Sequence, residues 1–155
     1  MKVLFPENPD AKIFEVTPEF ETVFGKVPII DDKAAAVSNV DGLFENLMVP
    51  ENENCIYGID YEWVFDFPIP SGFVRYRNLV YFYYKYEGLM EYENATQFLK
   101  EFGMDEKLAE TYASMEVAFQ TWVHGDGTQG YLGNYKQRLV TLEELKAQEK
   151  ELAHA

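Results

Sequence analysis

Residues 57–67 read YGIDYEWVFDF, and residues 73–86 read FVRYRNLVYFYYKY. In the first stretch, aromatic or aliphatic side chains occupy every odd position, whereas the even positions hold acids, a glycine and a valine. Alternation with a period of two is typical of a β-strand that buries one face and leaves the other in water. The segment PIPSG at 68–72 interrupts the pattern, so the two stretches predict an antiparallel hairpin.

The charges predict the register of this hairpin. If Glu62 faces Arg77, the acidic face of the first strand meets Arg75 and Arg77, and the aromatic faces meet each other. A shift of the pairing by one residue would set aromatic rings against charges. Registers of the other parity are therefore disfavoured. We therefore expect a small antiparallel sheet centred on the 57–67/73–86 hairpin.

Helical patterns lie on both sides of this hairpin in the sequence. Residues 33–48 carry apolar side chains at helical spacing, and Asn94 begins a capping box before an expected helix at 95–102. Asp105 is placed to cap a third helix over 106–123, which has the clearest apolar stripe. That stripe consists of Leu108, Tyr112, Met115, Phe119 and Trp122.

Shorter patterns complete the expected fold. Residues 12–16, 20–24 and 27–30 predict short strands, and a last capping box predicts a C-terminal helix at 142–154 that docks or protrudes. A length of 155 residues is typical of one domain. The sequence thus predicts a single α+β domain over 1–155, with helices packed on one face of the sheet.

Composition excludes several classes of protein. Apolar residues make up 47% of the chain and aromatic residues 16%, which excludes disorder over its whole length. The net charge of −14 disfavours direct binding to nucleic acid, because phosphate repels it. Cys55 is the single cysteine, so no intramolecular disulfide forms, and no apolar run is long enough to span a membrane. We expect a soluble, cytoplasmic protein.

The acids fall in two blocks. Residues 31–66 hold nine acids and one lysine, and residues 91–126 hold eight acids and two lysines. Rows of carboxylates can imitate the phosphates of a duplex and attract a basic protein, although acidity also serves solubility. The first hypothesis is a non-catalytic inhibitor, antagonist or immunity-type protein that binds a basic, nucleic-acid-binding protein. Its candidate contact residues are Asp31, Asp32, Asp41, Glu45, Asp60, Glu62 and Asp66.

Two alternatives belong to other classes. A structural protein could form a homo-oligomer through helix 142–154 and exposed tyrosines, of which Tyr81, Tyr83 and Tyr86 are the candidates. A small hydrolase could use Asp60 and Glu62, because neighbours two apart on a strand approach the spacing of about 5–5.5 Å found in retaining glycosidases. Ion pairs with the two arginines of the second strand also account for these acids.

Signatures of cofactors and metals are weak. The loop at 125–133 begins with a G-x-G-x-x-G pattern, but it follows an expected helix and begins none, which is unlike a dinucleotide site. His124, His154 and Cys55 have no spacing typical of metal ligands. We therefore expect neither a cofactor nor a metal.

Overall fold

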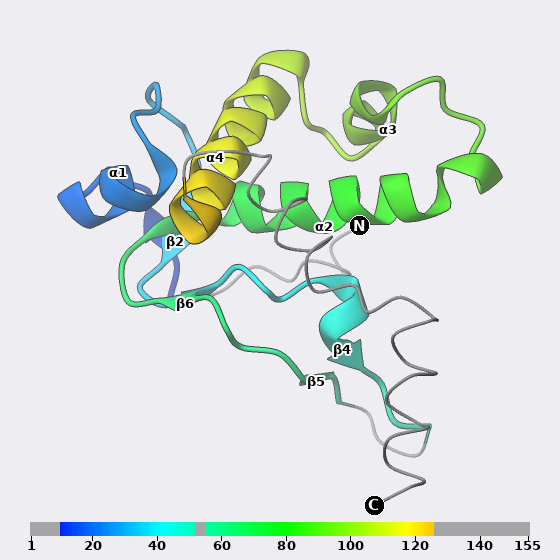
Figure 1. Ribbon diagram of the computed structural model, residues 1–155, viewed down its shortest axis with the longest axis horizontal. Helices are drawn as coiled ribbons and strands as arrows, with labels where there is room; N and C mark the ends of the chain where they lie inside the picture. The colour runs from blue at the N-terminus through cyan, green and yellow to red at the C-terminus, as the bar shows by residue number, and fades with distance from the viewer. Residues whose placement is uncertain (1–9, 52–54, 126–155) are drawn as a thin grey trace, which may run out of the picture. The chain divides into compact units, whose positions relative to one another are not determined.

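The computed structural model describes residues 10–51 and 55–125 (Figure 1). The chain divides into two compact units, residues 1–119 and 120–155, and the site described below belongs to the first. The expected terminal helix at 142–154 and the loop after Gly125 lie outside the described residues. None of the helices within the described residues is long and apolar enough to cross a membrane.

Seven strands of two or three residues each form three small antiparallel sheets within the described residues. The first sheet has the order β1 (Lys12–Ile13), β2 (Lys33–Ala35), β7 (Ile69–Pro70), with Ala34 opposite both Lys12 and Pro70. The other two sheets are the pairs β3 (Ser38–Asn39) with β6 (Val64–Phe65), and β4 (Leu47–Met48) with β5 (Tyr57–Gly58). Strands this short depend on the helices packed beside them for stability.

Four α-helices and two 3₁₀ turns complete the described part of the chain. The α-helices are α1 (Pro18–Phe24), α2 (Ser71–Tyr86), α3 (Ala95–Glu101) and α4 (Glu106–His124). The 3₁₀ turns are η1 (Phe44–Asn46) and η2 (Glu87–Leu89). The α+β class expected from the sequence is therefore confirmed.

The central hairpin of the prediction is wrong. Residues 73–86 belong to helix α2, which buries Phe73, Tyr76, Leu79 and Tyr83 on the spacing of a helix. Of the residues 57–67, only the short β5 and β6 form strands, and each pairs with an earlier segment. The run 73–86 fits both periods, and the helix that contains it begins at Ser71, directly after Pro70.

Several further expected elements differ from the structure: of the strand expected at 12–16 only β1 forms, and residues 27–30 form no strand. Residues 33–48 form β2, β3, η1 and β4 in place of a helix, because Gly42 and bonded polar side chains turn the backbone there. Residues 20–24, expected as a strand, lie in α1, where Thr17 Oγ1 accepts from the Phe20 N–H at 3.2 Å. The Thr-Pro pair at 17–18 is a signal for the start of a helix.

The two later helices follow their predicted bounds closely. Asn94 Oδ1 accepts from the Gln97 N–H at 2.9 Å at the start of α3. Asp105 Oδ1 accepts from the Leu108 N–H at 2.8 Å at the start of α4. Local caps therefore fix where both helices begin.

The core of the first unit is aromatic. The ring of Phe24 on α1 lies 5.1 to 5.7 Å, centroid to centroid, from four other rings. These rings come from α1, α2, α4 and β6, and they are Phe20, Phe73, Phe119 and Phe65. One buried ring thus joins three helices and a strand.

Candidate functional site

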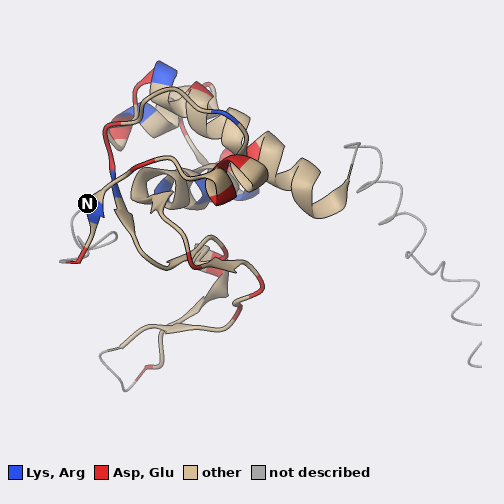
Figure 2. Ribbon diagram, turned by 90° about the vertical axis from the view of Figure 1, so that its left-hand side faces the viewer, with Lys and Arg blue, Asp and Glu red and all other residues tan. Residues whose placement is uncertain are grey.

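Residues 43–51 and 55–64, called the arm here, run out from the helices and return through the β4–β5 pair (Figures 1 and 2). Six large apolar side chains on the arm are between 49% and 66% exposed. They are Met48, Val49, Ile56, Tyr57, Ile59 and Tyr61. So many exposed apolar residues on one element are typical of an interaction surface.

The arm carries charge of one sign. The sequence has seven acids and no lysine, arginine or histidine between Lys33 and Arg75. Figure 2 shows acidic residues but no basic ones along the arm. The arm is therefore electrostatically complementary to a cationic surface and repels an anionic one.

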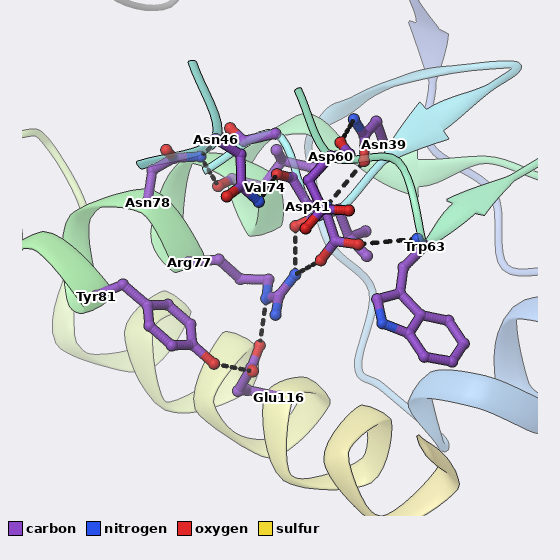
Figure 3. A network of polar contacts seen from close by, with 12 residues as sticks. Asn39, Asp41, Asn46, Asp60, Trp63, Val74, Arg77, Asn78, Tyr81 and Glu116 are labelled. Atoms are coloured by element: carbon purple, nitrogen blue, oxygen red, sulfur yellow. Dashed lines mark hydrogen bonds and ion pairs between the residues drawn. The ribbon is translucent and has the colours of Figure 1, made fainter. Parts of the chain in front are cut away.

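Hydrogen bonds around Asp41 hold the base of the arm together (Figure 3). Asp41 Oδ2 accepts from the Trp63 N–H at 2.8 Å, and the Asp41 carbonyl accepts from Asn46 Nδ2 at 2.9 Å. Asn39 Oδ1 accepts from the Asp41 N–H at 2.9 Å, and Asn39 Nδ2 donates to the Asp60 carbonyl at 3.4 Å. The outgoing and returning ends of the arm are thus joined at one point.

Arg77 of α2 lies behind this base and is only 4% exposed. Its Nε donates to Glu116 Oε2 at 2.8 Å, and its Nη1 donates to the Val40 carbonyl and lies 3.9 Å from Asp41 Oδ1. The guanidinium carbon also lies 5.0 Å from the centroid of the Phe119 ring. Arg77 therefore links the base of the arm to α4.

Burial raises the pKa of the Asp41 carboxyl above its ordinary value of 3.8. The Trp63 N–H and Arg77 oppose this rise, whereas the charges of Asp60 and Glu116 add to it. Desolvation thus outweighs the favourable partners of Asp41.

Three of the seven acids proposed from the sequence have partners within the chain. Asp32 Oδ2 accepts from the Gly72 N–H at 2.6 Å and from the Tyr112 hydroxyl at 3.0 Å. Asp41 has the contacts described above, and Glu45 Oε2 lies 2.9 Å from Lys85 Nζ. These three carboxylates make contacts within the fold as well as contributing charge.

The other four acids are open to solvent to different degrees. Asp60 is half-buried and Glu62 exposed on the arm, and Asp66 is exposed just after β6. Asp31 is exposed beside β2. The predicted pairing of Glu62 with Arg77 is wrong, because Arg77 bonds to Glu116 and Val40.

The candidate tyrosines lie on α2. Tyr83 is 5% exposed, and its hydroxyl donates to the Tyr92 carbonyl at 3.4 Å. Tyr81 and Tyr86 are about two-fifths exposed. The Tyr81 hydroxyl donates to Glu116 Oε1 at 3.1 Å, and burial together with the Glu116 charge raises the pKa of Tyr81.

Two cavities lie against α2. One of about 700 Å³ lies between the start of α2 and residues 31–47, and its wall contains Arg75, whose buried Nε has no hydrogen-bond acceptor among the described residues. The other, of about 430 Å³, lies against the second half of α2 and residues 43–45. Within residues 10–51 and 55–125, no group of three or more His, Cys, Asp or Glu side chains could hold a metal ion.

Sequence reasoning located the acids but missed the arm. The absence of any cation over residues 34–74 was the signal that could have found it. Comparison with known proteins adds no likeness: no protein family, curated protein or solved structure matches the chain. The function is therefore argued from the geometry of the arm and of α2.

Proposed function

We propose that this is a non-catalytic binding protein whose arm engages a basic protein. The observation that carries this proposal is the composition of the arm surface, which combines six exposed apolar side chains with carboxylates and no cation. Apolar area supplies affinity when water is excluded, and like charges across an interface are costly. The fitting partner thus has apolar side chains surrounded by lysine or arginine.

Within this class, we propose an inhibitor, antagonist or immunity-type protein that acts on a nucleic-acid-binding protein. Such targets expose basic grooves, and carboxylates steer association with them at rates that fall with ionic strength. We propose that the exposed Glu62 and the half-buried Asp60 of the arm contribute to this steering.

The alternatives differ in what supports them. A hydrolase at Asp60 and Glu62 requires the spacing of a continuous strand, but residues 59–63 do not form one. Assembly of a homo-oligomer through Tyr81 and Tyr86 retains exposed rings on α2. Measurement of molecular mass distinguishes assembly from capture of a different protein.

The test is capture from a lysate of the source by the tagged chain, at low and at high salt, read by mass spectrometry. We expect a basic protein that is retained at low salt and released at high salt. Ile59→Ser and Tyr61→Ser should each weaken binding of that protein by at least about fivefold, because both remove apolar contact area. Ile29→Ser, on a fully exposed residue outside the arm, is the matched control and should leave binding unchanged.

Two results would contradict the proposal. One is equal capture by the wild-type chain and both arm variants. The other is self-association that survives high salt and that Tyr86→Ser abolishes, which would favour the assembly alternative.

A further inference from the structure

The cavity against the second half of α2, called the aromatic cavity here, is lined mainly by rings. Its aromatic residues are Phe44, Tyr81, Phe82, Tyr84 and Tyr86. The Phe82 ring lies 6.0 Å from the Phe44 ring at a nearly perpendicular angle and 4.9 Å from the Tyr86 ring. At about 430 Å³, the cavity is in the size range of sites for small ligands or single side chains.

A cation of the chain itself already lies at this cavity. Lys85 Nζ is 2.9 Å from Glu45 Oε2 and 6.0 Å from the centroid of the Tyr86 ring. Both Lys85 and Glu45 line the cavity, and their side chains are about half exposed. Because this ion pair is open to water, another cation of the same geometry readily takes the place of the Lys85 ammonium beside Glu45.

The wall of the cavity also contains an unpaired acceptor. Asn78 is 3% exposed, and its Nδ2 donates to the Gly42 and Val74 carbonyls at 2.9 and 3.0 Å (Figure 3). Its Oδ1 is buried and has no hydrogen-bond donor within the described residues. Buried amide oxygens nearly always have a donor, so this oxygen of Asn78, a residue that lines both cavities, is an exception within the described residues.

We infer that the aromatic cavity receives an arginine side chain of the basic partner. Rings attract a cation, Glu45 supplies the opposite charge, and Asn78 Oδ1 accepts from an N–H. A guanidinium meets all three requirements, because it is planar, stacks on rings and carries five N–H donors. Lys85 is then the internal competitor that the arginine displaces. This inference rests on the proposed function for the identity of the partner as a basic protein.

The test uses the full chain and two small probes, N-acetylarginine methylamide and its neutral analogue N-acetylcitrulline methylamide. Binding is followed by NMR shifts of the cavity tyrosines. We expect the arginine probe to bind and the citrulline probe, which has the same shape without the charge, to bind much more weakly. Glu45→Gln and Tyr86→Leu should each weaken binding of the arginine probe.

Lys85→Met is the sharpest variant, because it keeps the apolar stem of an exposed side chain and removes the competing ammonium. It should bind the arginine probe roughly two- to fivefold more tightly. Lys100→Met makes the same change of net charge on α3, away from the cavity, and should leave binding unchanged. Equal binding of the two probes, or equal effects of the two lysine variants, would overturn the inference.

Failure of this inference can be told from failure of the proposed function. If the arginine probe does not bind but capture of a basic protein still depends on Tyr61, the inference is wrong and the function stands. If the probe binds at the cavity but the arm variants capture the partner normally, the cavity stands and the role of the arm is wrong.

Discussion

Gly72, in the first turn of α2, lies against Tyr112 of α4 and against Asp32, which directly precedes β2. A Cβ at this position would lie 2.4 Å from the Tyr112 hydroxyl oxygen and 2.6 Å from Asp32 Oδ2. Tyr112 is fully buried, so its ring has little room to withdraw. The absence of a side chain at 72 is therefore what lets Asp32 bond to the start of α2.

Gly72→Ala should destabilise the fold by about 1–3 kcal/mol, because overpacking outweighs the gain of about 1 kcal/mol in helix propensity. The free energy of unfolding in urea measures this effect. Gly88→Ala is the control, since nothing lies within 4 Å of the added Cβ there. A Gly72→Ala protein as stable as the control variant would contradict this account of the close approach.

Asp41 gives the base of the arm a dependence on pH. Because its pKa is raised in the folded state, the folded chain binds a proton more tightly than the unfolded chain does. This stabilising contribution is complete below the ordinary pKa of 3.8 and is lost as the pH rises through the raised value. The charged groups that act on Asp41 are Arg77, Asp60 and Glu116.

Asp41→Asn removes this titration, and its Oδ1 can still accept from the Trp63 N–H. We expect the wild type to lose stability relative to Asp41→Asn as the pH rises above 3.8. Urea unfolding of both proteins over a series of pH values measures the difference. If the free energies of unfolding of the two proteins changed with pH in parallel, the native state would not raise this pKa.

At the scale of elements, α2 is joined to α4 and to the arm through one buried cation. Replacing Arg77 by methionine removes the cation that contacts Glu116 and Asp41 and the N–H that donates to the Val40 carbonyl. We expect a loss of about 3–5 kcal/mol in the free energy of unfolding, as for other buried ion pairs broken on one side.

Arg75→Met is the matched control two residues earlier on the same helix. Within residues 10–51 and 55–125 the buried Nε of Arg75 has no acceptor, so its removal should cost less than about 1 kcal/mol. Hydrogen exchange of the arm amides provides the second measurement, and only the Arg77 variant should lower their protection. Equal stabilities of the two variants would contradict the linking role of Arg77.

Elements with local signals could be predicted from the sequence. Helices α3 and α4 begin at local caps, in which the capping side chain bonds to an N–H three residues later. Their apolar stripes fit the helical period and not the period of two of a strand. Residues 73–86 carry so many aromatic side chains that periods of two and of 3.6 both fit. The choice between them depends on distant contacts, namely Asp32 at the start of α2 and Phe24 against Phe73.

The candidate site was predictable in composition but not in arrangement. The excess of acids over 31–66 is plain in the sequence, whereas their separation into internal and outward-facing groups is not. Asp32 and Asp41 bond to backbone N–H groups 40 and 22 residues away. No local pattern marks such contacts, because they depend on how the elements pack.

At the scale of the molecule, the net charge of −14 does not form one uniform surface. Several of the acids before residue 67 act within the fold, and the arm presents its carboxylates beside apolar side chains. On α2, the cavity combines Glu45 with aromatic rings in the same way. Both surfaces thus pair negative charge with apolar area, which suits a partner whose lysines or arginines surround an apolar centre.

The hydrogen bonds of Asp32 also constrain the order in which the chain folds during its synthesis. Two of its partners, Gly72 and Tyr112, follow it by 40 and 80 residues. At a synthesis rate of about 5–20 residues per second, Tyr112 is added roughly 4–16 s after Asp32. A nascent chain that ends before Tyr112 has the cap of α2 without the hydroxyl that secures it. Cooperative folding of the first unit therefore waits for α4 to leave the ribosome.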